Sequence, residues 1–306
     1  TCCTPLQRSN KKSWFNTHNI HQSKLESSPD TDIIIIGDSL AAGLSRYNDV
    51  WFKYFRSALN LGIGGDRTQH LLWRVCNLKF PSSVKFVVLQ IGTNNIGRDT
   101  PFDIKNALLC LINILKKKMP NTNLLVTGLF PRENKFSKNC DIVTIINDML
   151  DQACFPLKNV EFIHPGEDWI LPNGNLDPKL FWIDNIHLKK AGYKRFAKSL
   201  RKHINLIEDK EREIKKSLCF KTLPPNSLIS PNIPQSSSLS KTSSQSLEHS
   251  TIPPPSYHLS SIIYHSPHPR ALKSTPKAIL APSLPPSSNI TCKPSYFQTV
   301  NVINHF

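Results

Sequence analysis

The sequence has 306 residues, a formal net charge of +16, 24 prolines and eight cysteines. A chain of this length forms one or two domains, and no apolar run approaches the roughly 18 residues that a membrane-spanning helix needs. The cysteines form no C-x-x-C pair and no zinc-type spacing with histidine. A reducing compartment is the simplest fit to such cysteines, so we expect a cytoplasmic protein.

The composition divides the chain into three segments. More than half of the prolines follow Leu223, in a tail rich in serine and leucine that has almost no acidic residues. Such a tail cannot bury enough apolar surface to offset the entropy lost on ordering it. We therefore predict a disordered N-terminal segment at 1–30, one folded domain at 31–207 and a basic, Ser/Pro-rich disordered tail at 208–306.

The folded domain is basic in its own right, with 24 Lys and Arg residues against 15 Asp and Glu residues in 31–207. Such a surface can attract nucleic acid or an anionic surface, although a solvated basic face is the simpler interpretation. Nucleic acid therefore stays open as a partner, but the sequence contains no RNA-binding motif or zinc knuckle to support it.

Apolar runs alternate with helical patterns along the folded domain. Five short runs predict β-strands, at 32–37, 58–64, 84–92, 122–130 and 160–165. Apolar residues at helical spacing predict helices at 45–58, 66–78, 101–118, 139–154 and about 189–207. This alternation predicts an α/β fold with a parallel sheet and helices on both faces. In such sheets, binding and catalytic sites form at the carboxyl ends of the strands.

The first predicted strand ends abruptly on Gly37-Asp38-Ser39. Ser39 would lie at the start of the next helix, where backbone N–H groups and the helix dipole favour a developing negative charge. An ordinary turn or helix cap explains the same three residues, so the triplet alone is a weak signal.

The second and third strands are followed by residues that can hold a ligand. Gly64 and Gly65 let the backbone approach a ligand closely and point N–H groups at it. Asn94, after the third strand, can donate its side-chain amide to an oxyanion. Each feature also has a structural interpretation, because paired glycines form tight turns and asparagine often closes its own turn.

Asp184 and His187 lie before the last predicted helix. A carboxylate three residues before a histidine can bond one ring nitrogen, which leaves the other nitrogen free to take a proton from a serine. Alone, Asp184 could simply be a helix cap. Taken together, these four segments supply a nucleophile, a base, a group that orients the base, and hydrogen-bond donors for an oxyanion. These are all the groups that acyl transfer by a serine requires.

The blocks GDS, NLGIGGD, IGTNN and DNIH, in this order and spacing, resemble the SGNH (GDSL-type) esterase superfamily. The second and third look especially like the catalytic subunits of intracellular platelet-activating-factor acetylhydrolases. The resemblance implies a flavodoxin-like three-layer α/β/α sandwich and a metal-independent serine hydrolase without a cofactor. It implies Ser39 as nucleophile, His187 as general base and Asp184 as its orienting group. The implied oxyanion hole is the N–H of Ser39, the N–H of Gly65 and the side chain of Asn94.

The sequence thus predicts a serine esterase that acts through an acyl-enzyme, and the resemblance implies that the acyl group is small, with acetyl as one candidate. Transfer of the acyl group to an alcohol instead of water would use the same residues. The alternative from another class is a non-catalytic or retroelement-type scaffold, associated with nucleic acid, that retains an esterase fold. An intact Ser39, Asn94, Asp184 and His187 argues against a scaffold.

Two short motifs lie in the predicted tail. Pro254, Pro255 and Tyr257 fit a PPxY ligand for a WW domain, and Pro282 and Pro285 fit PxxP. Both would present an extended polyproline helix. Such matches arise readily by chance in a segment so rich in proline.

Overall fold

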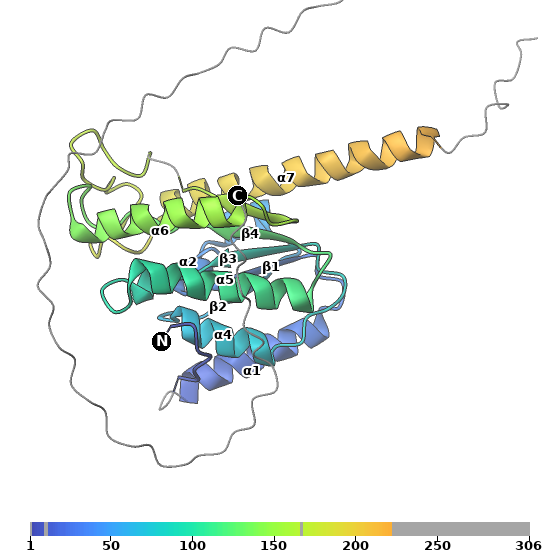
Figure 1. The fold of residues 1–306 in the computed structure, drawn as a ribbon, viewed down its shortest axis with the longest axis horizontal. Helices are drawn as coiled ribbons and strands as arrows, with labels where there is room; N and C mark the ends of the chain where they lie inside the picture. The colour runs from blue at the N-terminus through green and yellow to red at the C-terminus, as the bar shows by residue number, and fades with distance from the viewer. Residues whose placement is uncertain (1, 9–11, 166–167, 222–306) are drawn as a thin grey trace, which may run out of the picture. The chain divides into compact units, whose positions relative to one another are not determined.

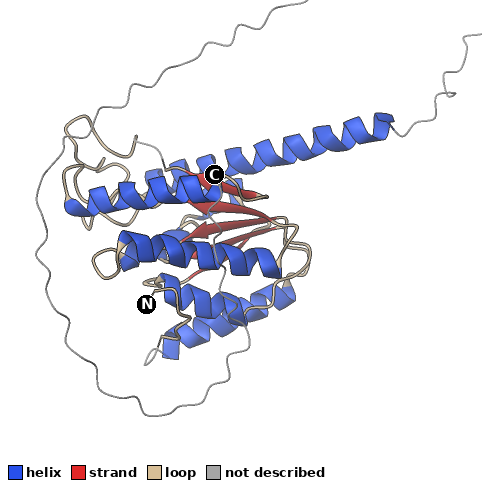
Figure 2. Ribbon diagram, viewed as in Figure 1, coloured by secondary structure: helices blue, strands red, loops and turns tan. Residues whose placement is uncertain are grey.

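The computed structural model describes residues 2–8, 12–165 and 168–221, and within them a five-stranded parallel sheet lies between two layers of helices (Figure 1 and Figure 2). The strands are β1 (Ile33–Gly37), β2 (Leu59–Gly62), β3 (Phe86–Gln90), β4 (Asn123–Thr127) and β5 (Val160–Ile163). Their order is β2-β1-β3-β4-β5, and every neighbouring pair is parallel. The order reverses at β1, so the switch point lies between β1 and β3. The predicted three-layer fold is confirmed.

Helices cover both faces of the sheet, together with a short 3-10 turn, η1 (Thr93–Asn95). The helices are α1 (Lys12–Ser27), α2 (Ser39–Gly43), α3 (Asn48–Tyr54), α4 (Thr68–Asn77), α5 (Pro101–Lys118), α6 (Lys138–Cys154) and α7 (Lys190–Lys221). Helices α4, α5 and α6 share one hydrophobic core with the sheet, and α2, α3 and α7 share a second core on the opposite face.

The isoleucine run of β1 explains this layering. Successive side chains of a strand point to opposite faces, so Ile34 and Ile36 enter the first core while Ile33 and Ile35 enter the second. All four are essentially inaccessible to solvent. Burial of one such side chain stabilises the fold by about 1.5–3 kcal/mol. A strand that is apolar on both faces is therefore an interior strand of this sheet, here between β2 and β3.

Two predicted boundaries are wrong. Residues 12–27 of the segment predicted to be disordered form α1, whose Trp14 and Leu25 are buried. The predicted tail also begins too early, because α7 continues from Lys190 to Lys221. The remainder of the tail, including Pro254, Pro255 and Tyr257 and the PxxP motif, lies outside the described residues.

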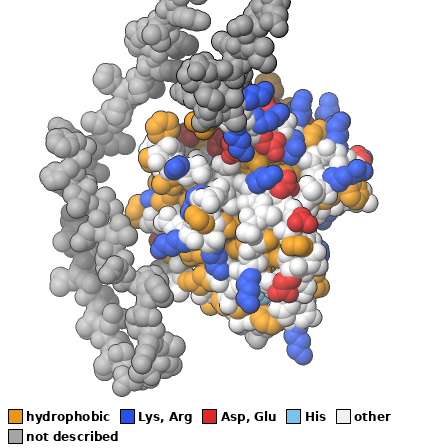
Figure 3. Space-filling view, turned by 90° about the vertical axis from the view of Figure 1, so that its right-hand side faces the viewer, with side chains coloured by type: hydrophobic (Ala, Val, Ile, Leu, Met, Phe, Trp, Pro, Cys, Tyr) orange, Lys and Arg blue, Asp and Glu red, His pale blue; other side chains and the backbone are white. Residues whose placement is uncertain are grey.

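The charged side chains of the molecular surface are spread out where Figure 3 displays them. Lys and Arg side chains are interspersed there with Asp and Glu and with apolar patches, as expected for a solvated face. Among the described residues, no helix is both long and apolar enough to cross a membrane.

Candidate active site

Ser39 lies where β1 turns into α2, at the carboxyl edge of the sheet. Gly37 ends β1 so close to β3 that an added Cβ would meet the backbone oxygen of Gln90 at 1.8 Å. Asp38 then begins the helix by accepting a hydrogen bond from the backbone N–H of Leu40, at 2.9 Å. Ser39 is therefore held at the first residue of α2, directly after the interior strand β1.

His187 lies between Ser39 and Asp184. Its Nε2 is 2.9 Å from the Oγ of Ser39, and its Nδ1 is 2.7 Å from Oδ2 of Asp184. With Nδ1 donating to the carboxylate, Nε2 is the nitrogen that accepts the serine proton. The structure therefore joins Ser39, His187 and Asp184 in one row of hydrogen bonds, although Ser39 and His187 are 148 positions apart in the sequence.

The carboxylate of Asp184 is fixed by its own loop. Its Oδ1 accepts the backbone N–H groups of Ile186 and His187, each at 3.0 Å. Partial burial raises the pKa of Asp184, but the hydrogen bonds from His187 and Ile186 outweigh it and hold this pKa below its ordinary value. Asp184 therefore stays ionised and can stabilise a protonated imidazole.

Gly64 and Gly65 pass close to Ser39 after β2. A Cβ added to Gly64 would lie 3.9 Å from the Cβ of Ser39, and Gly65 has a φ of +75°. That left-handed conformation suits glycine. Within the described part of the chain, the backbone N–H groups of Ser39 and Gly65 have no hydrogen-bond partner. Both remain available to an oxyanion.

The two asparagines of η1 have different surroundings. Asn94 lines a pocket, and its Nδ2 donates one hydrogen bond, of 2.9 Å, to the backbone oxygen of Asp66. The second hydrogen of the same amide is not used by this bond. Asn95 is buried, accepts the N–H of Thr68 and donates to Asp99. Asn95 therefore holds the turn, while Asn94 can reach a ligand.

A buried cluster that sequence reasoning missed supports the Gly64–Gly65 loop. Asp66 accepts hydrogen bonds from Trp14 Nε1 at 2.7 Å and from Arg74 Nη1 at 2.9 Å, and both Asp66 and Arg74 are inaccessible to solvent. A buried carboxylate needs such partners, because an unpaired buried charge is costly. The cluster ties α1 and α4 to the loop that carries Gly65. Nothing in the local sequence indicates that Trp14 would lie there.

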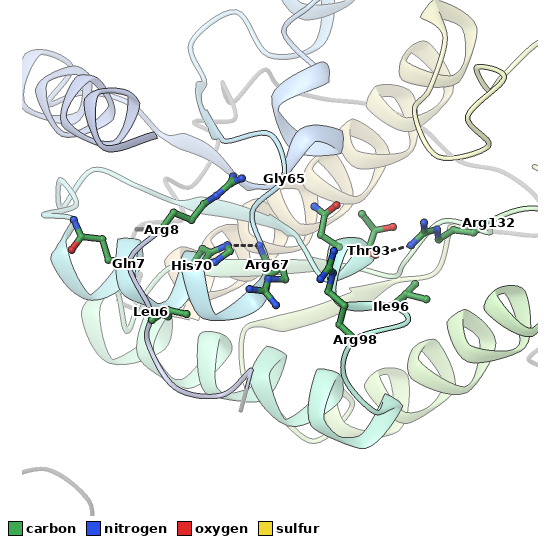
Figure 4. Close-up of a pocket in the computed structure, with 11 residues that line it drawn as sticks. Leu6, Gln7, Arg8, Gly65, Arg67, His70, Thr93, Ile96, Arg98 and Arg132 are labelled. Atoms are coloured by element: carbon green, nitrogen blue, oxygen red, sulfur yellow. Dashed lines mark hydrogen bonds between the residues drawn. The ribbon is translucent and has the colours of Figure 1, made fainter. Parts of the chain in front are cut away.

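A pocket of about 530 Å³ adjoins Gly65 and Asn94 (Figure 4). Its lining comes from the N-terminal segment, the loop between β2 and α4, the first turn of α4, η1 and the loops after η1 and β4: Leu6, Gln7, Arg8, Gly65, Arg67, His70, Thr93, Asn94, Ile96, Arg98 and Arg132. The sequence does not predict this group of arginines, because they come from four separate stretches of the chain. Within the described residues, no three His, Cys, Asp or Glu side chains gather in a way that could hold a metal ion.

The chain is similar to known proteins in both sequence and fold. The GDSL-like Lipase/Acylhydrolase family model matches residues 35–195, which include Ser39, Asp184 and His187. The human platelet-activating factor acetylhydrolase IB subunit alpha2 is 27% identical over 204 residues, covering 65% of this chain and 87% of that protein. The bovine alpha1 subunit is 27% identical over 191 residues, covering 61% of this chain and 80% of that protein.

The fold has a counterpart among solved structures. A GDSL-like lipase from Bacteroides thetaiotaomicron superposes with a TM-score of 0.54 at 15% identity, covering 63% of this chain and 99% of that protein.

Proposed function

The chain belongs to the GDSL-like lipase/acylhydrolase family and is a carboxylic ester hydrolase, and on this premise we propose that Ser39, His187 and Asp184 hydrolyse small acyl esters through an acyl-enzyme. The observation that carries the proposal is the position of His187, with Nε2 2.9 Å from Ser39 Oγ and Nδ1 2.7 Å from Asp184 Oδ2. A serine becomes nucleophilic when an adjacent base takes its proton.

In the first half of the proposed reaction, Ser39 Oγ attacks the ester carbonyl while His187 Nε2 takes the serine proton. The oxyanion accepts hydrogen bonds from the N–H groups of Ser39 and Gly65 and from the free amide hydrogen of Asn94. When the tetrahedral intermediate collapses, the bond between the acyl carbon and the ester oxygen breaks, and His187 returns the proton to the departing alcohol.

In the second half, His187 removes a proton from water as the water oxygen attacks the acyl carbon. The bond from that carbon to Ser39 Oγ then breaks, His187 protonates the serine again, and a carboxylic acid leaves. Asp184 holds the imidazole in one tautomer and stabilises its positive charge in both halves. No step requires a cofactor.

A fluorophosphonate that labels activated serines tests the nucleophile and its base. We expect mass spectrometry to find the adduct on Ser39, and we expect His187→Ala to lose it while remaining folded. His203→Ala is the matched control, because His203 is also bonded to a carboxylate, that of Glu161, but lies on α7 and does not contact Ser39. Absence of an adduct in the folded wild-type protein would refute the assigned triad.

The small acyl group is supported by the names of the relatives, which are acetylhydrolases. We expect p-nitrophenyl acetate to be hydrolysed with a higher kcat/KM than the butyrate and octanoate esters. A higher kcat/KM for the octanoate ester, measured below its critical micelle concentration, would contradict the preference for small acyl groups. It would not contradict the assignment of the triad.

A further inference from the structure

Helix α7 continues past the part of the chain that forms the hydrophobic cores. The last buried residue of the described chain is Ile204, whereas every side chain from Asp209 to Leu218 is exposed. Figure 1 shows these turns extending beyond the ends of the strands. We refer to residues 208–218 as the α7 extension. The family match ends at residue 195, so the extension lies beyond the part of the chain that matches the family.

The face of α7 that packs on the sheet continues into the extension as an apolar stripe. Its positions alternate in spacings of four and three residues: Tyr193, Ala197, Leu200, Ile204, Ile207, Ile214 and Leu218, with Glu211 at the one polar position. The first four belong to the second core, whereas Ile214 and Leu218 are 59% and 56% exposed. We call Ile207, Ile214 and Leu218 the apolar stripe. This spacing is that of a coiled-coil seam, so the stripe indicates a second helix as its partner.

Local charge pairs do not explain the apolar stripe. Arg212 forms an ion pair with Asp209, one turn earlier on the same helix. Such pairs stabilise a helix only slightly, and a helical segment as short as the extension is marginal in water unless an amphipathic face packs on something. The apolar side chains supply such a face, because they all lie on one side of the extension.

The charges of the extension are divided between its two halves. Residues 208–213 have four acidic and two basic side chains, a net charge of −2, whereas residues 214–218 have Lys215, Lys216 and no acidic residue, a net charge of +2. Two copies lying in the same direction would bring like charges together in both halves. Two copies lying in opposite directions bring each acidic half against a basic half, and a two-fold axis repeats that contact.

The residues that flank the seam favour the same direction. Glu208 and Lys215 each follow a seam residue, Ile207 and Ile214, and lie one heptad apart. In an antiparallel pair, Glu208 of one copy lies near Lys215 of the other, whereas a parallel pair would place Lys210 near Lys215. The extension is therefore complementary to itself only when one copy is reversed.

We propose that the α7 extension is a self-association surface, on which the apolar stripe of one copy packs against that of a second copy in antiparallel orientation. The extension lies on the side of the sheet remote from the proposed triad. Glu211 accepts a hydrogen bond from Asn123, the first residue of β4, at 3.0 Å, whereas Ser39 follows the carboxyl end of β1. Association of this kind therefore leaves the proposed active sites of both copies open.

Sedimentation equilibrium of the full chain tests the apolar stripe. We expect the mass of the wild-type protein to rise with concentration to about twice or more that of the double variant Ile214→Gln, Leu218→Gln, which loses apolar contacts without a change of charge. Leu206→Gln is the matched control, because Leu206 is 45% exposed on the same helix but lies off the seam, and it should associate as the wild type does. Equal masses for the wild type and the double variant, with helix content unchanged by circular dichroism, would overturn the proposal. An assembly through another face of the domain would give that result.

Charge reversal tests why the partner is a second copy. Lys215→Glu with Lys216→Glu makes both halves of the extension −2, and Glu208→Lys with Glu213→Lys makes both halves +2. We expect each variant alone to associate as poorly as the stripe variant, and an equimolar mixture of the two to recover the wild-type mass. A mixture that stays at the mass of its components would overturn the proposal. Lys194→Glu with Lys198→Glu is the control, because these lysines are exposed on α7 before the extension.

The orientation is read by a photo-crosslink. With p-benzoylphenylalanine in place of Leu218 and a mixture of isotope-labelled and unlabelled protein, mass spectrometry identifies crosslinks that join two copies. We expect them to lead from position 218 to the first half of the extension or to Ile207 in the other copy. Crosslinks from position 218 to the same position would show a parallel pair and would contradict the proposed arrangement.

Discussion

Asp38 gives a pH dependence that can be worked out from the structure. Its carboxyl is fully buried, and burial raises its pKa from 3.8 to about 7, against the hydrogen bond from Leu40 N–H. Oδ2 of Asp38 has no partner among the described residues. The pKa of Asp38 is higher in the folded protein than in the unfolded chain, so the folded state holds the proton more tightly. The free energy of unfolding therefore falls as the pH rises from about 4 to about 7.

The size of this loss follows from the two pKa values. Between about pH 5 and pH 8, ionisation of Asp38 lowers the free energy of unfolding by about 2–3 kcal/mol. Asp38→Asn keeps an oxygen that can accept from Leu40 N–H but has no charge to bury, so it does not suffer this loss. The variant is therefore expected to gain about 2–3 kcal/mol relative to the wild type as the pH rises.

Urea unfolding at pH 5 and pH 8, for wild type and Asp38→Asn, measures this gain. The difference between the two proteins at each pH removes the contributions of all other titrating groups. Asp30→Asn serves as the control, because Asp30 is exposed and the same change should give no pH-dependent difference. If Asp38→Asn shifted stability equally at both pH values, the buried carboxyl would not be the source of the pH dependence.

Three further substitutions test the scaffold and the site. Gly37→Ala should cost at least about 3 kcal/mol in urea unfolding, because the new Cβ would meet the backbone oxygen of Gln90 at 1.8 Å. Trp14→Phe should cost about 2 kcal/mol, because it removes the indole donor from the buried Asp66, and an unchanged midpoint would contradict this. Asp184→Asn should lower kcat/KM for p-nitrophenyl acetate by about 100-fold without altering the unfolding midpoint.

The parts of the fold that were predicted correctly have local causes. The continuous apolar run at 33–36 identifies a strand covered on both faces, and the polar residues placed after the strands share one edge because parallel strands end there. For that reason the pattern of the sequence is enough to bring Ser39 and His187 to the same edge of the sheet. Helix α2, with five residues, is too short to show a period, so the pattern does not predict it.

The parts that escaped prediction depend on long-range contacts. The buried face of α1 includes His18 and His21 beside Trp14, so its apolar period is weak. Arg8 reaches Gly64 across 56 positions. Neither feature can be read from a window of neighbouring residues.

The cluster of Trp14, Asp66 and Arg74 has a consequence for how this enzyme can change over time. The family match begins at residue 35, whereas two residues that contact the site lie before it: Arg8 lines the pocket beside the proposed oxyanion donors, and Trp14 bonds the buried Asp66. The proposed reacting groups and part of the pocket beside them thus come from different stretches of the sequence. Substitutions at Arg8 can change the lining of the pocket without touching the proposed triad, whereas a fragment that starts at residue 31 would lose Trp14 from Asp66 and Leu25 from the core.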